Sequence, residues 1–160
     1  MDQNLPLSVT HEVRDRCLCL HLQRAARRVA RRFDETLGAV GLTNGQFSLL
    51  TAMNRPEPPA ITHLARFLAM DRTTLTAALK PLSRRGLVMD VADTKDRRNR
   101  RLTLTDQGRE LLIIAVPIWR KAHDDLDEAL DLSRSRGLRE YLEDLSAPSR
   151  TVDGTAHQRP

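Results

Sequence analysis

Residues 70–88 read MDRTTLTAALKPLSRRGLV, and the spacing of the leucines in this stretch predicts an amphipathic helix. Asp71 is a suitable N-cap residue, and Gly86 is suitable to end the helix after about Arg85. The opposite face carries threonines and basic residues, with no acidic residue beyond the cap, and simple solvation explains such a face poorly. The stripe expected to be buried consists of Leu75, Leu79 and Leu82.

The residues before this helix predict two further helices. LTNGQF (42–47) has the spacing of a capping box, with Thr43 as the N-cap and Gln46 three residues later. That helix should end at the proline-rich segment 54–59. A short helix over 61–70 follows and is separated only by a tight turn from the helix described above, which is typical of a helix-turn-helix.

After the helix-turn-helix, the hydrophobic period changes to that of strands. Residues 87–92 and 101–105 alternate between apolar and polar side chains, which predicts a β-hairpin. The segment DTKDRRNRR (93–101), at the tip of this hairpin, has five positive charges among its nine residues. A helix-turn-helix followed by a hairpin with a basic tip has the element order of a winged helix, which we place at residues 42–104.

Long helices flank the winged helix. Apolar residues recur at helical spacing over 11–40, and Thr105 is positioned to cap a second long helix. A last helix, with Ser133 as its expected cap, completes a C-terminal helical region over 105–146. These helices carry more apolar surface than a winged-helix core can cover, which predicts packing against a second copy of the chain.

The predicted fold is therefore mainly α with a small β-hairpin wing: a winged helix-turn-helix flanked by long N- and C-terminal dimerisation helices. Residues 1–10 are expected to form an arm, and 147–160 a disordered tail. The net charge of +5 over 160 residues favours an acidic partner such as nucleic acid.

Several function classes lack support in the sequence. There is no glycine-rich phosphate loop, no G-x-S-x-G and no H-E-x-x-H, so we expect no enzymatic activity and no cofactor. The histidines and cysteines are not spaced as metal ligands, which argues against a metal site. Neither a membrane span nor a secretory signal is evident, so a cytoplasmic protein is expected.

The helix that follows Asp71 is expected to enter the major groove of DNA. Arginine and lysine contact guanine or phosphate there, threonine reaches phosphate or base edges, and small residues contact thymine methyl groups. Pro81 should bend this helix, because proline removes one backbone hydrogen bond. The DNA-binding residues expected on the helix are Arg72, Thr73, Thr74, Thr76, Ala77, Lys80 and Arg84.

The basic hairpin tip suits the minor groove, because a groove narrowed by A·T sequence concentrates negative potential and attracts arginine. Asp96 lies two residues before Arg98 and can hold its guanidinium group in a bidentate pair. Arg97, Arg100 and Arg101 are then expected to hold phosphates. A solvated charge run is the alternative, but the helix-turn-helix that precedes this segment favours DNA.

Three segments, LTNGQFSLL (42–50), MDRTTLTAALKPLSRRGLV (70–88) and DTKDRRNRRLTLTDQG (93–108), resemble the MarR family of bacterial transcription regulators. The wing signature of that family has the form D-x-x-D-R-R followed by L-x-L-T-x-x-G. The resemblance implies a homodimer that binds a pseudo-palindromic operator, usually as a repressor, with Arg98 in the minor groove and Asp96 as its partner. The two recognition helices of such a dimer lie about 34 Å apart, one turn of DNA.

The resemblance also implies an inducer, often a small aromatic or lipophilic anion, that binds between the dimerisation helices and the winged helix and releases DNA. His21, Phe47 and Trp119 are candidate lining residues, although a core or surface position would explain each of them as well. The arginines of the first helix could instead hold a phosphorylated inducer such as an acyl-CoA thioester, or they could simply be a solvated face; they are Arg24, Arg27, Arg28, Arg31 and Arg32.

Two alternatives remain open. Cys19 lies where the organic-peroxide-sensing members of the family carry a reactive cysteine, so a redox-sensing repressor of the same fold is one alternative. The tyrosines that the resemblance would place around this cysteine are missing, since the only tyrosine of the chain is Tyr141. A winged helix that binds protein is the other alternative, and it should expose apolar anchors where this sequence has basic residues. Neither the operator nor the regulated genes follow from these patterns.

Overall fold

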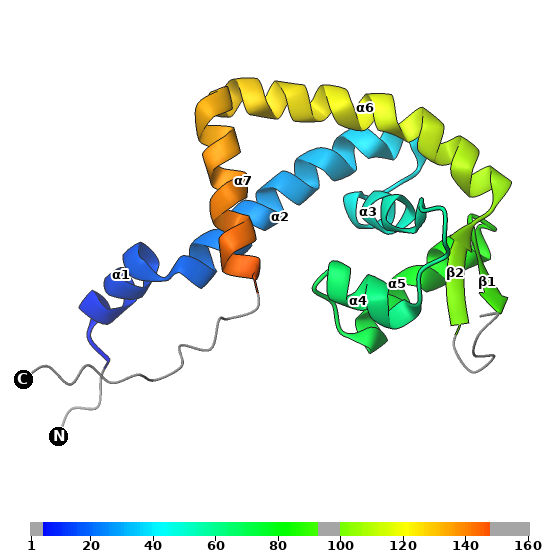
Figure 1. Cartoon of the computed structure of the whole chain (residues 1–160). Coiled ribbons are helices and arrows are strands. Elements are labelled where there is room, and N and C mark those ends of the chain that lie inside the picture. The colour runs from blue at the N-terminus through cyan, green and yellow to red at the C-terminus, as the bar shows by residue number, and fades with distance from the viewer. Residues whose placement is uncertain (1–4, 93–99, 148–160) are drawn as a thin grey trace, which may run out of the picture. The chain divides into compact units, whose positions relative to one another are not determined.

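The computed structural model describes residues 5–92 and 100–147 and confirms a winged helix-turn-helix flanked by long helices (Figure 1). The chain forms two compact units that divide within the last long helix, after Ala122. The second unit holds α7 (Leu132–Ser146) and the last residues, from His123 on, of α6 (Asp106–Leu130). The elements of the first unit are α1 (Leu7–Arg16), α2 (Leu18–Leu37), the 3₁₀ helix η1 (Gly38–Val40), α3 (Asn44–Met53), α4 (Ile61–Phe67), α5 (Arg72–Arg84), β1 (Val88–Ala92), β2 (Arg100–Leu104) and most of α6 (Asp106–Leu130).

The winged helix is built on the predicted caps and on a leucine core. The capping box of α3 is present, with Gln46 N donating to Thr43 Oγ1 at 3.2 Å and Thr43 N donating to Gln46 Oε1 at 3.1 Å. α4 is shorter than predicted and ends at Phe67, because Ala69 has a left-handed backbone with φ 51°. The predicted stripe of α5, Leu75, Leu79 and Leu82, is buried, and Leu64 and Ala65 of α4 are buried as well.

β1 and β2 form the predicted antiparallel hairpin, in which Val88 pairs with Leu104. The segment before α4 extends this pairing along β2, since Leu102 N donates to Pro59 O at 3.1 Å. The loop at the tip, residues 93–99, lies outside the described residues.

α6 starts where the predicted cap places it. Thr105 Oγ1 accepts from Gly108 N at 3.0 Å and donates to the carbonyl of Gly86 at 2.6 Å. Gly108 lies so close to the turn between α5 and β1 that a Cβ atom on it would stand 2.0 Å from the carbonyl oxygen of Leu87. This close approach explains the glycine that ends the L-x-L-T-x-x-G signature. α6 then continues through Pro117 without interruption.

The prediction of one helix over 11–40 is wrong at its start. Helix α1 begins at Leu7, so the segment expected to be an arm is partly helical. The helical backbone is interrupted at Cys17, which has an extended conformation with ψ 98°. The sulfur of Cys17 accepts a hydrogen bond from Leu20 N at 3.4 Å and thereby caps α2. No residue of α1 is buried, so the apolar period could not reveal this helix.

Two further helix ends differ from the predictions. α2 ends at Leu37, and the chain continues as η1 to Gly41, whose left-handed φ of 68° ends the helical segment. α7 is capped by Asp131 rather than by Ser133, because the Asp131 carboxylate accepts bonds from both N and Oγ of Ser133 at 3.0 Å. Of the expected tail, all but Ala147 lies outside the described residues. Within the part of the chain that the structure describes, no helix could cross a membrane.

Candidate nucleic-acid interface

The outer face of α5 carries the predicted major-groove residues, and all of them are exposed. The buried leucine stripe fixes the rotation of α5, so the intervening residues face solvent. Among the residues 5–92 and 100–147, no ion pair neutralises Arg72, Lys80 or Arg84. The exposed set is Arg72, Thr73, Thr74, Thr76, Ala77, Lys80 and Arg84. This face has the positive charge that binding to phosphates requires, and it exposes no large apolar anchor for a protein partner.

The threonines of α5 differ in what their hydroxyl groups do. Thr74 donates to the Asp71 carboxylate through both its backbone N, at 2.8 Å, and its hydroxyl, so it completes the cap of α5. These two hydrogen bonds hold the pKa of Asp71 below its ordinary value, with the hydroxyl bond contributing most. The Thr76 hydroxyl donates to Arg72 O at 2.7 Å. Thr73 is the remaining predicted threonine, and its exposed hydroxyl bonds to no other described residue.

Pro81 does not end α5, the recognition helix. Its missing N–H leaves the carbonyl of Ala77 without a helical donor. The helix nevertheless continues to Arg84, and Arg85 N donates to Pro81 O at 3.1 Å. All the predicted DNA-binding residues of the helix except Arg84 lie before the proline.

Of the residues predicted to bind DNA from the hairpin tip, the structure describes Arg100 and Arg101. Arg100 is exposed, and its Nη2 lies 2.8 Å from Asp90 Oδ2. An exposed pair of this kind is weak, so Arg100 can exchange Asp90 for a phosphate. Arg101 is half-buried and donates from Nη1 to Pro58 O at 2.8 Å, which ties β2 to the segment before α4. Asp96, Arg97 and Arg98 lie outside the described residues.

Two of the three predicted ligand-lining residues lie together. The rings of Phe47 and Trp119 stack with centroids 5.7 Å apart and planes inclined by 22°, which joins α3 to α6. Both line a cavity of about 310 Å³, whereas His21 is exposed on α2 and does not line it. The sequence did not reveal Arg55 and Phe67, which line the same cavity; the guanidinium carbon of Arg55 lies 5.0 Å from the Phe67 ring centroid.

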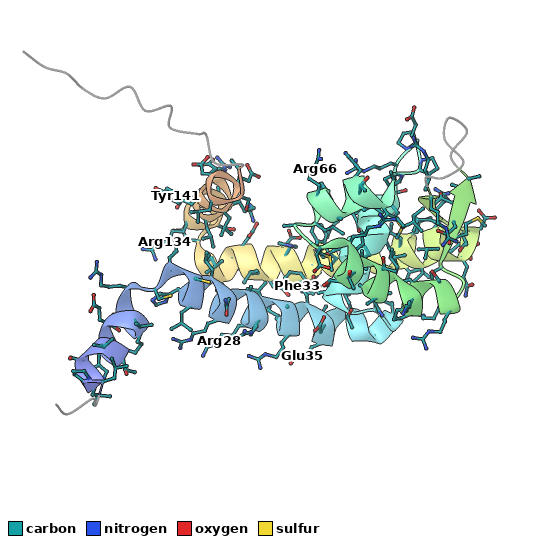
Figure 2. The ribbon with its side chains drawn as sticks, turned by 90° about the horizontal axis from the view of Figure 1, so that it is seen from below. Arg28, Phe33, Glu35, Arg66, Arg134 and Tyr141 are labelled. Carbon is teal, nitrogen blue, oxygen red and sulfur yellow. The ribbon has the colours of Figure 1, made fainter. Side chains whose placement is uncertain are left out.

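The predicted arginines of the first long helix form the outer basic face of α2. Figure 2 shows Arg28 and Glu35 on the outer side of this helix, and Phe33 on the side toward the winged helix. Phe33 is buried, which fixes the direction of the outer face. The arginines of this face are Arg24, Arg27, Arg28 and Arg31, which are exposed, and Arg32, which is half-buried.

The two cysteines lie at the start of α2, and both are free thiols. Cys17 is half-buried and caps the helix, whereas Cys19 is exposed and its sulfur lies 3.2 Å from Gln23 Nε2. Across the parts of the chain that are described, no three histidine, cysteine, aspartate or glutamate residues are grouped so that they could hold a metal ion.

Comparison with known proteins agrees with this geometry. A sequence profile of the MarR family matches residues 42–99. The HTH-type transcriptional regulator SarZ of Staphylococcus haemolyticus is 30% identical over 117 residues, which cover 73% of this chain and 77% of SarZ.

Solved structures of DNA-bound regulators have the same fold. The M. tuberculosis transcriptional regulator MosR in complex with DNA is 34% identical with a TM-score of 0.73, and the match covers 81% of this chain and 93% of MosR. The transcriptional repressor CouR bound to a 23-mer DNA duplex is 30% identical with a TM-score of 0.74, and the match covers 90% of this chain and 99% of CouR. CouR bound to p-coumaroyl-CoA is 28% identical with a TM-score of 0.74, over 82% of this chain and 93% of CouR.

Proposed function

The chain belongs to the MarR family of DNA-binding winged-helix transcription regulators, which are not enzymes, and we propose that it is a homodimeric repressor released from its operator by a small aromatic or lipophilic anion. The observation that carries the proposal is the outer face of the recognition helix, where three cations have no ion-pair partner among the described residues. In the major groove, Arg72, Thr73, Thr76 and Ala77 would approach base edges, and Lys80 and Arg84 would bind phosphates. Thr74 supports the helix cap.

The wing is proposed to bind the adjacent minor groove. Arg98 would enter the groove with Asp96 as its partner, and Arg97 and Arg100 would bind phosphates on either side. Arg101 would support this contact indirectly, because its bond to Pro58 holds the part of β2 next to the hairpin tip against the segment before α4.

The homodimer is proposed because the long helices expose apolar side chains. Leu18 and Val29 on α2 are 54% and 39% exposed. α7 exposes an apolar stripe at helical spacing, formed by Leu138, Tyr141, Leu142 and Leu145. Exposed apolar side chains on each of these helices are typical of an interface, and a twofold dimer would present two recognition helices about 34 Å apart to a pseudo-palindromic operator.

Single substitutions test the DNA interface. Lys80→Ala should weaken binding to operator and random duplex alike and reduce the slope of log K against log salt by about 1, because one phosphate contact is lost. Arg98→Ala should weaken operator binding about tenfold or more, because it removes the minor-groove contact. Arg28→Ala removes the same charge from the outer face of α2 and should bind as the wild type does. An equal loss in Arg28→Ala would mean that net charge alone drives binding.

The inducer is proposed to bind beside the Phe47–Trp119 stack. The cavity of about 310 Å³ suits a small ligand, and Arg55 beside the Phe67 ring supplies a cation next to an aromatic surface. These features fit an aromatic carboxylate. A larger cavity of about 450 Å³ lies between α3 and α5, but no charged residue lines it.

The second ligand class is an acyl-CoA thioester, since CouR binds p-coumaroyl-CoA. The phosphates of such a ligand would need cations beyond the cavity. The arginines of α2 are proposed for this role, because arginine binds phosphate through two parallel N–H donors, although none of them lines the cavity itself.

Fluorescence of Trp119, the only tryptophan, provides a direct ligand assay. Saturable quenching by p-coumarate should weaken about tenfold in Arg55→Ala, because a charged hydrogen-bond donor is lost. Arg120→Ala, an exposed charge change on the same helix as Trp119, should leave the titration unchanged. If p-coumaroyl-CoA quenches the fluorescence and p-coumarate does not, and if Arg28→Ala weakens that quenching, the result would instead support the thioester class. No response to either compound in the wild type would remove both classes.

The α1–α2 junction favours a second mode of release, by oxidation. The exposed Cys19 thiol can take one oxygen from an organic hydroperoxide to form a sulfenic acid, leaving an alcohol. Cys17, two residues away, caps α2 with its sulfur. Oxidation of Cys19 would therefore disturb the start of α2, one of the proposed dimerisation helices. Cumene hydroperoxide should then lower the DNA affinity of the wild type but not of Cys19→Ser, with recovery in dithiothreitol. A wild type that is insensitive to the hydroperoxide would exclude this mode.

A further inference from the structure

The C-terminal end of the recognition helix is attached to the start of α6. The carbonyl of Gly86 accepts from Thr105 Oγ1 at 2.6 Å, and the carbonyl of Leu87 accepts from Thr105 N at 3.1 Å. Gly108 lies against the same turn, with no room for a Cβ atom. One of the two long helices of the first unit therefore begins on the turn that ends the recognition helix.

Arg85 makes the corresponding attachment to the other long helix. Its Nη1 donates to Gly41 O at 2.7 Å, across 44 positions of sequence. Gly41 closes η1 in a left-handed conformation with φ 68° and ψ 29°, and a Cβ atom on Gly41 would stand 3.6 Å from Nη2 of Arg85. The backbone N of Arg85 donates to Pro81 O, so the side chain extends from the cap of the recognition helix itself.

We propose that Arg85 is a positioning residue, which fixes the end of the recognition helix to the end of α2 and does not contact DNA. The proposal rests on the proposed function, because the position of α5 matters only if two recognition helices bind one operator. They must then reach major-groove segments about 34 Å apart, and rotation of α5 at an end held only by its contacts to α6 would change that spacing. The side chain of the neighbouring Arg84 makes no hydrogen bond or ion pair with another described residue, so Arg84 is the matched phosphate-binding candidate.

Hydrogen exchange of the full-length protein without DNA tests the attachment. Arg85→Ala should raise the exchange rates of the Gly41 and Leu42 amides about tenfold, because the lost bond has a charged donor. Both amides donate to carbonyls of the α2–η1 end, at 3.0 and 3.1 Å, so they report its stability. Arg84→Ala removes the same charge and should leave these rates unchanged. Unchanged exchange in Arg85→Ala would overturn the proposal.

DNA binding at several salt concentrations tests the consequence. Arg85→Ala should lower the ratio of operator to random-duplex affinity about tenfold and leave the salt slope unchanged, whereas Arg84→Ala should weaken both duplexes and lower the slope by about 1. A slope lowered by about 1 in Arg85→Ala, with both duplexes weakened equally, would show that Arg85 binds phosphate and would overturn the proposal. If the wild type prefers no duplex, the proposed function fails, while the exchange experiment still decides whether the attachment exists.

Discussion

Gly108→Ala should destabilise the protein by separating the start of α6 from the turn after the recognition helix. The added Cβ atom would stand 2.0 Å from the Leu87 carbonyl oxygen and 3.0 Å from its carbonyl carbon, where ordinary contact starts at 3.4 Å. Because the opposing atoms belong to the backbone, no side-chain rotation relieves the overlap. The start of α6 must move by roughly 1 Å in a close-packed region.

The expected loss follows from the bonds at this contact. A displacement of this size disrupts the bond from Thr105 N to Leu87 O and strains the bond from Thr105 Oγ1 to Gly86 O. A hydrogen bond contributes about 1 kcal/mol and overpacking costs about 1–3 kcal/mol, so the free energy of unfolding should fall by about 2–4 kcal/mol. Each kcal/mol lowers Tm by about 2–4 °C in a chain of this size, which gives a fall of roughly 5–15 °C.

Thermal unfolding followed by circular dichroism measures this loss, with Gly38→Ala as the control. Gly38 has a helical φ of −57°, and a Cβ atom on it would meet nothing within 4 Å. Alanine there should be neutral or stabilising by about 0.4–1 kcal/mol. A Gly108→Ala protein with the Tm of the wild type would refute the reasoning, because the close approach to Leu87 would then have no energetic consequence.

Three further predictions concern pH and the cysteine. Asp71→Ala should lower Tm at pH 7, because the ionised carboxylate caps α5. Since the folded-state pKa of Asp71 lies below 3.8, the difference in Tm between wild type and variant should persist at every pH above 3.8 and disappear as the pH falls through the folded-state pKa. Thermal melting between pH 7 and pH 2 measures this difference. Burial lowers the pKa of His123 below 6.5, so stability should decrease as the pH falls below that value, and His123→Gln should remove this decrease. Stability that instead rises on acidification would show that the Asp127 carboxylate dominates. Cys19→Ser should bind operator as the wild type does in reducing buffer, and a loss of affinity there would make Cys19 structural.

The helix-turn-helix could be predicted from the sequence because its determinants are local. The leucine period of α5 and the caps by Thr43 and Asp71 each act within a turn or two of helix, and all are present in the structure. The hairpin could be predicted for the same reason, since its strands alternate and adjoin a single loop.

The contacts between distant segments could not be predicted. Arg85 bonds to Gly41 across 44 positions and Arg101 to Pro58 across 43, and no pattern in either segment indicates its partner. Arg55 lies in a turn rich in proline, where no period shows which way a side chain faces. The break before α2 was missed because no glycine or proline marks it, and the sulfur of Cys17 supplies an unusual cap.

The most direct test of the central claim is fluorescence anisotropy of the wild-type protein on DNA from immediately upstream of its own gene, compared with random duplex at several salt concentrations. We predict binding to the upstream DNA that is about 10³-fold or more tighter than to random duplex, with an affinity that falls steeply as the salt concentration rises. Equal and weak binding to both duplexes, with no better site elsewhere in the genome, would contradict a sequence-specific regulator.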